Sequence, residues 1–195
     1  MFTEWARKVS RGIVEPLAKF LGHIGLSANA LTILGALLSI LVGVVIAQGH
    51  LRLGGALLIV AGAFDALDGT LARQMGQATK FGAFLDSTLD RLSESAVLLG
   101  LAWWYMGQPG RLEEMLAYIT LFGSMWVSYV RARAEGIATE CKVGLFTRVE
   151  RAILIIAALI LGLTVPALWI LAVGTILTSL QRIWHVYRQT QQAML

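Results

Sequence analysis

Four aspartates are the residues best suited to chemistry in this chain. They are its only aspartates, and all fall within FDALDGTLARQMGQATKFGAFLDSTLDRLSE as Asp65, Asp68, Asp86 and Asp90. An aspartate inside a membrane helix costs about 2.5–3.5 kcal/mol, so four of them need compensation, which a bound cation supplies. Carboxylate oxygens suit a hard ion, Mg²⁺ or Mn²⁺. No histidine or cysteine lies among them, which argues against zinc.

The spacing of these residues predicts a single site. One helix face, an arc of about 140°, carries the residues Asp65, Asp68, Gly69, Ala72 and Arg73. The next helix presents a stripe repeating every four residues, namely Gly82, Asp86 and Asp90. Because the intervening loop is short, the two helices are expected to be antiparallel neighbours. The glycines leave space for close approach of a ligand to the backbone, and Arg73 offers positive charge to a phosphate.

The acidic cluster is also compatible with two roles outside catalysis. Intramembrane carboxylates can form a cation or proton pathway, or a structural cluster paired with arginines. A pathway should place acidic groups at several depths, whereas these four gather at one membrane face. This favours a site that is open to one side of the membrane. A non-enzymatic channel or adaptor with a divalent-cation site stays as the alternative of another class.

The elements that must position the aspartates are predicted from composition. Of the 195 residues, 57% are hydrophobic and 14% are charged, against about 25% charged in a soluble domain. Six apolar runs are long enough to cross a bilayer: 29–49, 52–73, 82–107, 111–134, 149–165 and 167–188. Pro166 is expected to separate the last two. The fold class is therefore an all-α polytopic membrane protein, with residues 1–195 as one domain and the six-helix bundle in 25–190.

Residues 1–24 read as an amphipathic helix lying on the membrane surface, with Trp5, Ile13, Val14, Leu17 and Phe20 near one another and basic residues among them. The single cysteine, Cys141, excludes a disulfide within one chain and is expected in a loop.

The basic residues predict the orientation. If the N-terminus is cytoplasmic, all but two of the 16 lysines and arginines fall on the cytoplasmic side, the exceptions being Arg52 and Arg111. The positive-inside rule then places both termini and the aspartates at the cytoplasmic face of the cell membrane. The net charge of +4 reflects this topology and gives no support to nucleic-acid binding.

The aspartate pattern resembles a known family. The spacing Asp-x₂-Asp-Gly-x₂-Ala-Arg-x₈-Gly-x₃-Asp-x₃-Asp is the signature of the CDP-alcohol phosphotransferases, and this chain matches it at every fixed position. The resemblance implies that Asp65, Asp68 and Asp86 ligate divalent metal, with Asp90 near the same site and acting as general base. It also implies a CDP-lipid seat, formed by Asp68, Gly69, Ala72, Arg73 and Gly82.

The resemblance extends to GLSANALTILG, residues 25–35, where Thr32 matches a family threonine and is added to the CDP-lipid residues. Ala28 stands where the family usually has proline, while Ser27 fits a helix cap. The family is commonly homodimeric, and a dimer is expected on that ground alone.

The acceptor is predicted from a second set of basic residues. Segments SYVRARAE, TRVERAILI and LQRIWHVY resemble the phosphatidylinositol phosphate and archaetidylinositol phosphate synthases. The resemblance implies an acceptor-phosphate site at Arg131, Arg148, Arg151 and Arg182. The expected reaction transfers the lipid phosphate of CDP-diacylglycerol to inositol 1-phosphate and releases CMP. Glycerol 3-phosphate, as in a phosphatidylglycerol phosphate synthase, is the alternative acceptor, followed by serine or another alcohol. Glu94, one turn after Asp90, is expected to tune the aspartate site or to pair with Arg91; the sequence does not decide between them.

Overall fold

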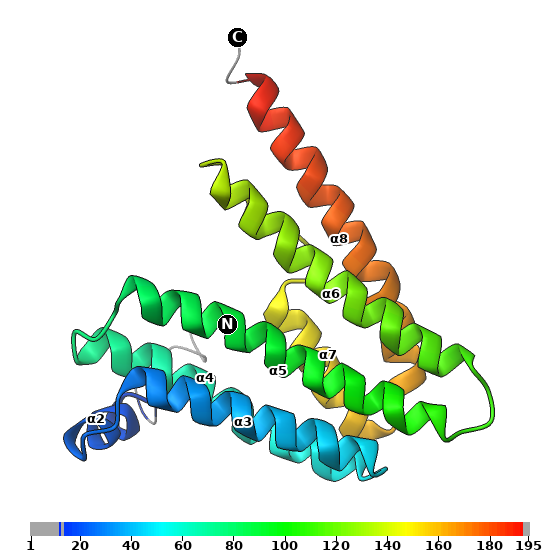
Figure 1. The fold of residues 1–195 in the computed structure, drawn as a ribbon, viewed down its shortest axis with the longest axis horizontal. Helices are drawn as coiled ribbons and strands as arrows, with labels where there is room; N and C mark the ends of the chain where they lie inside the picture. The colour runs from blue at the N-terminus through cyan, green and yellow to red at the C-terminus, as the bar shows by residue number, and fades with distance from the viewer. Residues whose placement is uncertain (1–11, 13, 193–195) are drawn as a thin grey trace. The chain divides into compact units, whose positions relative to one another are not determined.

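The fold is helical throughout the part of the chain that the structure, a computed structural model, describes, namely residues 12 and 14–192. The helices follow one another along the chain as α2 (Glu15–His23), α3 (Ala28–Ala47), α4 (Leu51–Gln74), α5 (Lys80–Met106), α6 (Leu112–Gly136), α7 (Arg148–Leu161) and α8 (Thr164–Gln192) (Figure 1). The six apolar runs thus correspond to α3 through α8. Of the surface helix predicted in 1–24, α2 covers the second half. Trp5 and Ile13 lie outside the described residues.

The chain divides into two compact units. One comprises the chain up to Leu41 together with Leu57–Ser93, and the other comprises Val42–Ala56 together with Glu94 onward. Helices α3, α4 and α5 contribute residues to both. All four aspartates belong to the first unit, and the four arginines predicted to bind the acceptor belong to the second.

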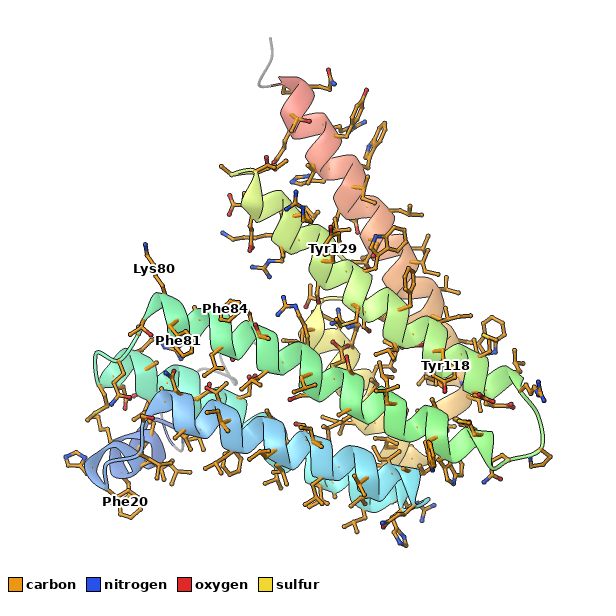
Figure 2. All side chains as sticks on the ribbon, in the orientation of Figure 1. Phe20, Lys80, Phe81, Phe84, Tyr118 and Tyr129 are labelled. Atoms are coloured by element: carbon orange, nitrogen blue, oxygen red, sulfur yellow. The ribbon has the colours of Figure 1, made fainter. Side chains whose placement is uncertain are left out.

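The surface of the described residues is strongly apolar. Large hydrophobic side chains are exposed on every described helix, for example Leu37 on α3, Ile59 on α4 and Ile170 on α8. Figure 2 shows Phe81 and Phe84 projecting outward from α5. A soluble monomer rarely exposes so much contiguous apolar area, so these faces suit contact with lipid.

Three of the described helices, α3, α4 and α8, are long and apolar enough to cross a membrane. Helix α7 has 14 residues, a length of about 21 Å, which is shorter than a hydrocarbon core of about 30 Å. Helix α5 has ample length but carries charged residues over its first half. Six membrane spans therefore stay a prediction. For α5, α6 and α7 to cross the membrane, neighbouring helices would have to cover their polar groups.

The prediction that Pro166 separates the last two helices is wrong. The break lies at Gly162, whose φ of 75° is left-handed, and α8 already begins at Thr164. Pro166 thus falls in the first turn of α8. A backbone N–H in the first turn has no intrahelical acceptor, so proline removes no helical hydrogen bond there.

Glycines allow two close helix crossings within the second unit. A Cβ at Gly100 on α5 would lie 2.1 Å from the carbonyl oxygen of Gly43 on α3. A Cβ at Gly123 on α6 would lie 2.0 Å from Oγ1 of Thr175 on α8, and Figure 1 shows these two helices side by side. Gly43 belongs to the small-residue segment GALLSILVG and Thr175 to AVGTILTS, and both residues pack within the chain at these crossings.

Cys141 lies in the loop between α6 and α7 and is 1% exposed. Burial raises the pKa of its thiol, and the nearby Arg182 opposes this only in part. Because the thiolate is the reactive form, we expect the folded protein in detergent to react with a maleimide at neutral pH much more slowly than the denatured protein. Mass spectrometry of timed aliquots measures this, and rapid labelling of the folded protein would contradict the burial.

Candidate active site

Three of the four aspartates come together in the first unit. Asp65 and Asp68 on α4 and Asp86 on α5 each offer a carboxylate oxygen, and these atoms all lie within 4.8 Å of one another. Asp68 and Asp65 are three residues apart, so they share a face of α4. Asp90 is not a member of this three-residue group and follows Asp86 by one turn of α5.

The group has the properties of a site for a divalent cation. Asp68 is 5% exposed, and its Oδ2 is a buried atom with no hydrogen-bond partner. Leaving a buried carboxylate oxygen unsatisfied is costly, and a cation relieves that cost. The set consists only of oxygens, which Mg²⁺ and Mn²⁺ prefer. The residues present therefore fit a hard divalent ion.

The side chain of Arg73 covers the backbone at Gly69, next to Asp68. At Gly69 the nearest neighbour of an added Cβ would be Nη1 of Arg73, at 3.4 Å, so the guanidinium lies over this glycine. Nη2 of Arg73 also donates to Oγ1 of Thr70 at 3.2 Å. The Arg73 side chain therefore folds back along α4 toward Gly69 and Thr70.

Gly82, on the first turn of α5, lies beside two polar residues that the signature does not include. An added Cβ there would meet Oδ1 of Asn29 and Oγ1 of Thr79, each at 3.1 Å. Oγ1 of Thr79 also accepts the Gly82 N–H at 2.9 Å. Asn29 comes from α3 and Thr79 from the loop before α5, so residues far apart in the chain line this region of the first unit. Sequence reasoning missed Asn29 and Thr79, although both are close in the chain to residues of the family pattern.

The start of α3 shows why alanine can replace the family proline. The Ala28 N–H donates to Oε1 of Gln77 at 3.0 Å, a bond that proline could not make. Ser27 Oγ accepts the Ala30 N–H at 3.2 Å, which confirms the predicted cap. Thr32 donates to the Ala28 carbonyl at 3.0 Å and neighbours the Asp68 carboxylate.

The predicted acceptor arginines lie in different environments of the second unit. Arg131 near the end of α6 is exposed and pairs with Glu135 at 2.9 Å. Arg148 is the exposed first residue of α7. Arg182 on α8 is 3% exposed and donates to the carbonyls of residues 127 and 143 at 2.7 and 2.9 Å. Arg131 and Arg151 are both electrostatic neighbours of Arg182.

Arg151 has the most complete set of protein partners. It forms a two-pronged ion pair with Glu94 on α5, and both N–O distances are 2.6 Å. Glu94 therefore pairs with Arg151, and the predicted pairing with Arg91 is wrong. Sequence reasoning had no signal for the observed pair, because the residues are 57 positions apart and only the packing of α5 against α7 brings them together.

The sequence matches a known protein family and relatives within it. The sequence model for CDP-alcohol phosphatidyltransferase matches residues 26–180. The archaetidylinositol phosphate synthase of Methanothermobacter thermautotrophicus is 38% identical over 189 residues, covering 94% of this chain and 93% of that protein.

Two solved structures of the phosphatidylinositol phosphate synthase of Mycobacterium tuberculosis are similar to most of the chain. The structure with CDP-DAG bound superposes with a TM-score of 0.86 at 33% identity, covering 90% of this chain and 94% of the other. The structure in complex with manganese and citrate has the same TM-score and identity, with coverage of 90% and 89%. Since the family pattern spans most of the chain and its aspartates gather as a cation site would require, this protein is a membrane enzyme of the CDP-alcohol phosphatidyltransferase family.

Proposed function

We propose that the protein transfers the phosphatidyl group of CDP-diacylglycerol to inositol 1-phosphate, giving phosphatidylinositol phosphate and CMP. The observation that carries the choice of acceptor is the group of arginines formed by Arg131, Arg151 and Arg182, which come from three helices and are electrostatic neighbours in the second unit. A phosphorylated acceptor needs such a positive environment, and an uncharged alcohol does not. The names of the related synthases support the same acceptor.

The first unit supplies the proposed donor site. Asp65, Asp68 and Asp86 hold the divalent ion, Mg²⁺ or Mn²⁺, which when bound neutralises charge on the diphosphate of the CDP-lipid. The CDP moiety lies against the backbone at Gly69 and Gly82, which carry no side chain, and Ala72 keeps the α4 face small. Arg73 and Thr32 border this seat and offer donors to the nucleotide and its phosphates.

Asp90 acts as the general base in the proposed reaction. Its carboxylate takes the proton from the acceptor hydroxyl, whose oxygen forms a new bond to the β-phosphorus of the donor. The bond from that phosphorus to the bridging oxygen breaks, and the electron pair leaves with CMP. Arg131, Arg148, Arg151 and Arg182 hold the acceptor phosphate, so that its hydroxyl is presented in one orientation. The membrane arrangement proposed with this reaction has six spans, cytoplasmic termini, a cytoplasmic active site and a homodimeric assembly.

CMP release by the purified protein tests the acceptor. With CDP-diacylglycerol and Mg²⁺, inositol 1-phosphate is expected to support turnover, because the arginine group binds its phosphate. Free inositol is the matched control, since it has the same ring without the phosphate, and it should support at most a small fraction of that rate. A diether CDP-lipid in a parallel reaction tests the donor, and EDTA should stop all reactions.

CMP release with glycerol 3-phosphate and none with inositol 1-phosphate would overturn the proposed acceptor while leaving the family chemistry in place. Equal rates with inositol 1-phosphate and free inositol would show that the arginines do not select a phosphate.

A further inference from the structure

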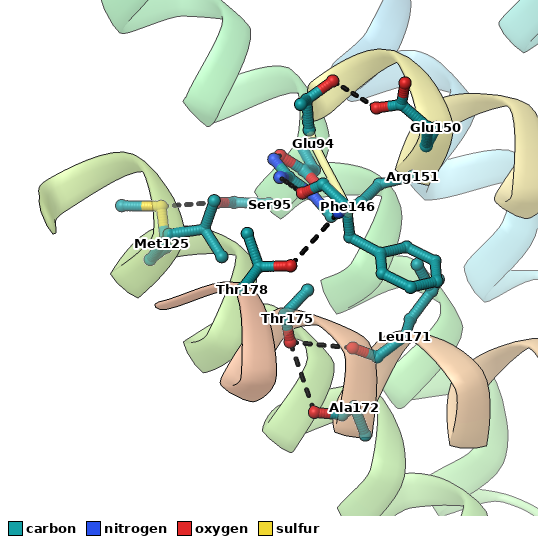
Figure 3. A network of polar contacts seen from close by, with 12 residues as sticks. Glu94, Ser95, Met125, Phe146, Glu150, Arg151, Leu171, Ala172, Thr175 and Thr178 are labelled. Atoms are coloured by element: carbon teal, nitrogen blue, oxygen red, sulfur yellow. Dashed lines mark hydrogen bonds and ion pairs between the residues drawn. The ribbon is translucent and has the colours of Figure 1, made fainter. Parts of the chain in front are cut away.

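The first turn of α3 is held by a side chain from the loop after α4. The Ala28 N–H donates to Oε1 of Gln77 at 3.0 Å, although the two residues are 49 positions apart. The first N–H groups of a helix have no intrahelical acceptor, and Ala28 is 6% exposed, so Gln77 satisfies a donor that has little access to water. A comparable bond precedes α7, where the Phe146 N–H donates to Oγ1 of Thr178 on α8 at 3.1 Å (Figure 3).

The position of Gln77 is itself fixed by the end of α4. Gly76 has a left-handed φ of 63°, and the Gln77 N–H donates to the Ala72 carbonyl at 2.9 Å. This is the six-to-one bond of a Schellman motif, which closes the C-terminus of a helix. Ala72 follows Asp68 by one turn of α4. The side chain that holds α3 is therefore anchored to the helix that carries two of the three clustered aspartates.

The residues that follow Ala28 border the proposed donor site. Oγ1 of Thr32 donates to the Ala28 carbonyl at 3.0 Å, and Thr32 neighbours the Asp68 carboxylate. One residue after Ala28, Oδ1 of Asn29 lies 3.1 Å from the place where a Cβ on Gly82 would be. A rotation or shift of the first turn of α3 would therefore move two polar side chains of this site together.

Apolar packing also joins α3 to α4, but it does not fix the rotation of α3. Ala28 and Leu31 on α3 pack in one buried cluster with Leu67 and Leu71 on α4. Hydrophobic contact is non-directional, so such a cluster tolerates small rotations. A hydrogen bond requires defined positions of donor and acceptor. The bond from the Ala28 N–H is therefore the contact that sets the orientation of this turn.

We propose that Gln77 is a positioning residue for the CDP-lipid donor. Its amide oxygen fixes the start of α3 through the Ala28 N–H, so that Asn29 and Thr32 are presented to the nucleotide and its phosphates in one orientation. Proline at position 28 would fix the same turn by its preset φ and would need no acceptor. The inference rests on the proposed function, because it takes Asn29 and Thr32 as part of the donor site.

Titration of the purified protein with CDP-diacylglycerol in detergent, with Mn²⁺ and without an acceptor, measures donor affinity by calorimetry. Gln77→Ala removes the bond to Ala28 and should weaken donor binding by about three- to ten-fold, the range expected for the loss of one hydrogen bond. In turnover, the KM for the donor should rise by a similar factor. The KM for the acceptor should change little, since the predicted acceptor arginines belong to the other unit.

Ala28→Pro tests whether Gln77 acts through the Ala28 N–H. Proline has no N–H, and its fixed φ suits the first turn of a helix. Gln77→Ala should therefore have no further effect in the Ala28→Pro background, and the double variant should bind the donor within about two-fold of the wild type. Gln108→Ala is the matched control, because Gln108 is also an exposed glutamine in a loop that follows a helix, and it should leave donor affinity unchanged. Thermal unfolding is measured for every variant.

Weaker donor binding in Gln77→Ala that is restored in the double variant supports positioning. An equal loss in both backgrounds would overturn the proposal, because Gln77 would then act without the Ala28 N–H. Unchanged donor binding in Gln77→Ala would overturn it as well. Weak donor binding in both proline variants, or equal increases in both KM values with a lower unfolding temperature, would reduce the bond to a structural one and also overturn the proposal.

The wild type reports separately on the proposed function. Because donor binding is measured without an acceptor, a wild type that binds CDP-diacylglycerol but does not use inositol 1-phosphate would overturn the proposed acceptor and leave the role of Gln77 to be decided by the variants. A wild type that does not bind CDP-diacylglycerol would overturn both proposals.

Discussion

Replacing Asp90 by asparagine is expected to lower CMP release by about 10²–10⁴-fold, the usual contribution of a general base. Asparagine has nearly the same size as aspartate and cannot accept the proton of the acceptor hydroxyl. The three carboxylates that lie within 4.8 Å of one another do not include Asp90, so binding of divalent metal should survive. Titration with Mn²⁺, followed by quenching of the protein's fluorescence or by calorimetry, measures metal binding. Release of labelled CMP measures turnover.

Asp68→Asn is the matched comparison for Asp90→Asn. It removes a carboxylate from within the three-residue group and should reduce Mn²⁺ affinity and CMP release together. If Asp90→Asn retained turnover and Asp68→Asn did not, Asp90 would have no role as the base. If both variants lost metal and activity in parallel, Asp90 would act mainly as a fourth ligand.

Substitution of Gly100 by alanine is expected to destabilise the second unit by about 1–3 kcal/mol, the usual cost of overpacking. The added methyl carbon would lie 2.1 Å from the Gly43 carbonyl oxygen and 2.9 Å from its Cα. These are backbone atoms, which cannot rotate away as a side chain can. Helices α3 and α5 must therefore separate. The unfolding temperature in detergent, followed by circular dichroism, should fall by several degrees.

Gly62→Ala is the control for this effect. Gly62 also lies within a helix, α4, but an added Cβ there has no other atom within 4 Å. Alanine should stabilise the helix by up to about 1 kcal/mol, because it loses less backbone entropy than glycine. A lower unfolding temperature for Gly62→Ala, or an unchanged one for Gly100→Ala, would contradict the crossing described for α3 and α5.

Much of the fold could be predicted because its signals are local. Apolar runs located α3 through α8 to within a few residues, and the three-residue spacing of Asp65 and Asp68 placed them on one face of α4. The prediction that Pro166 separates the last two helices failed because proline is common both just before a helix and in the first turn within it. The left-handed Gly162 decided between the two.

The contacts that could not be predicted join residues that are far apart in the chain. Gln77 bonds to Ala28 across 49 positions, and only the tertiary structure brings the loop after α4 to the start of α3. Arg91 was a nearer and equally suitable partner for Glu94, so spacing alone could not identify Arg151 as the partner. The position of an arginine in the sequence also does not reveal whether its side chain is buried. Arg151 and Arg182 lie near helix ends, yet both side chains are buried within the protein.

The Glu94–Arg151 pair also has a consequence for biosynthesis. The ribosome makes α5 first, and 57 residues separate the carboxylate from its guanidinium partner. During translation, α5 is therefore complete before its countercharge exists, and the pair closes only when α7 arrives. The order of translation thus makes the arrival of α7 a late step that completes the internal charge balance of the enzyme.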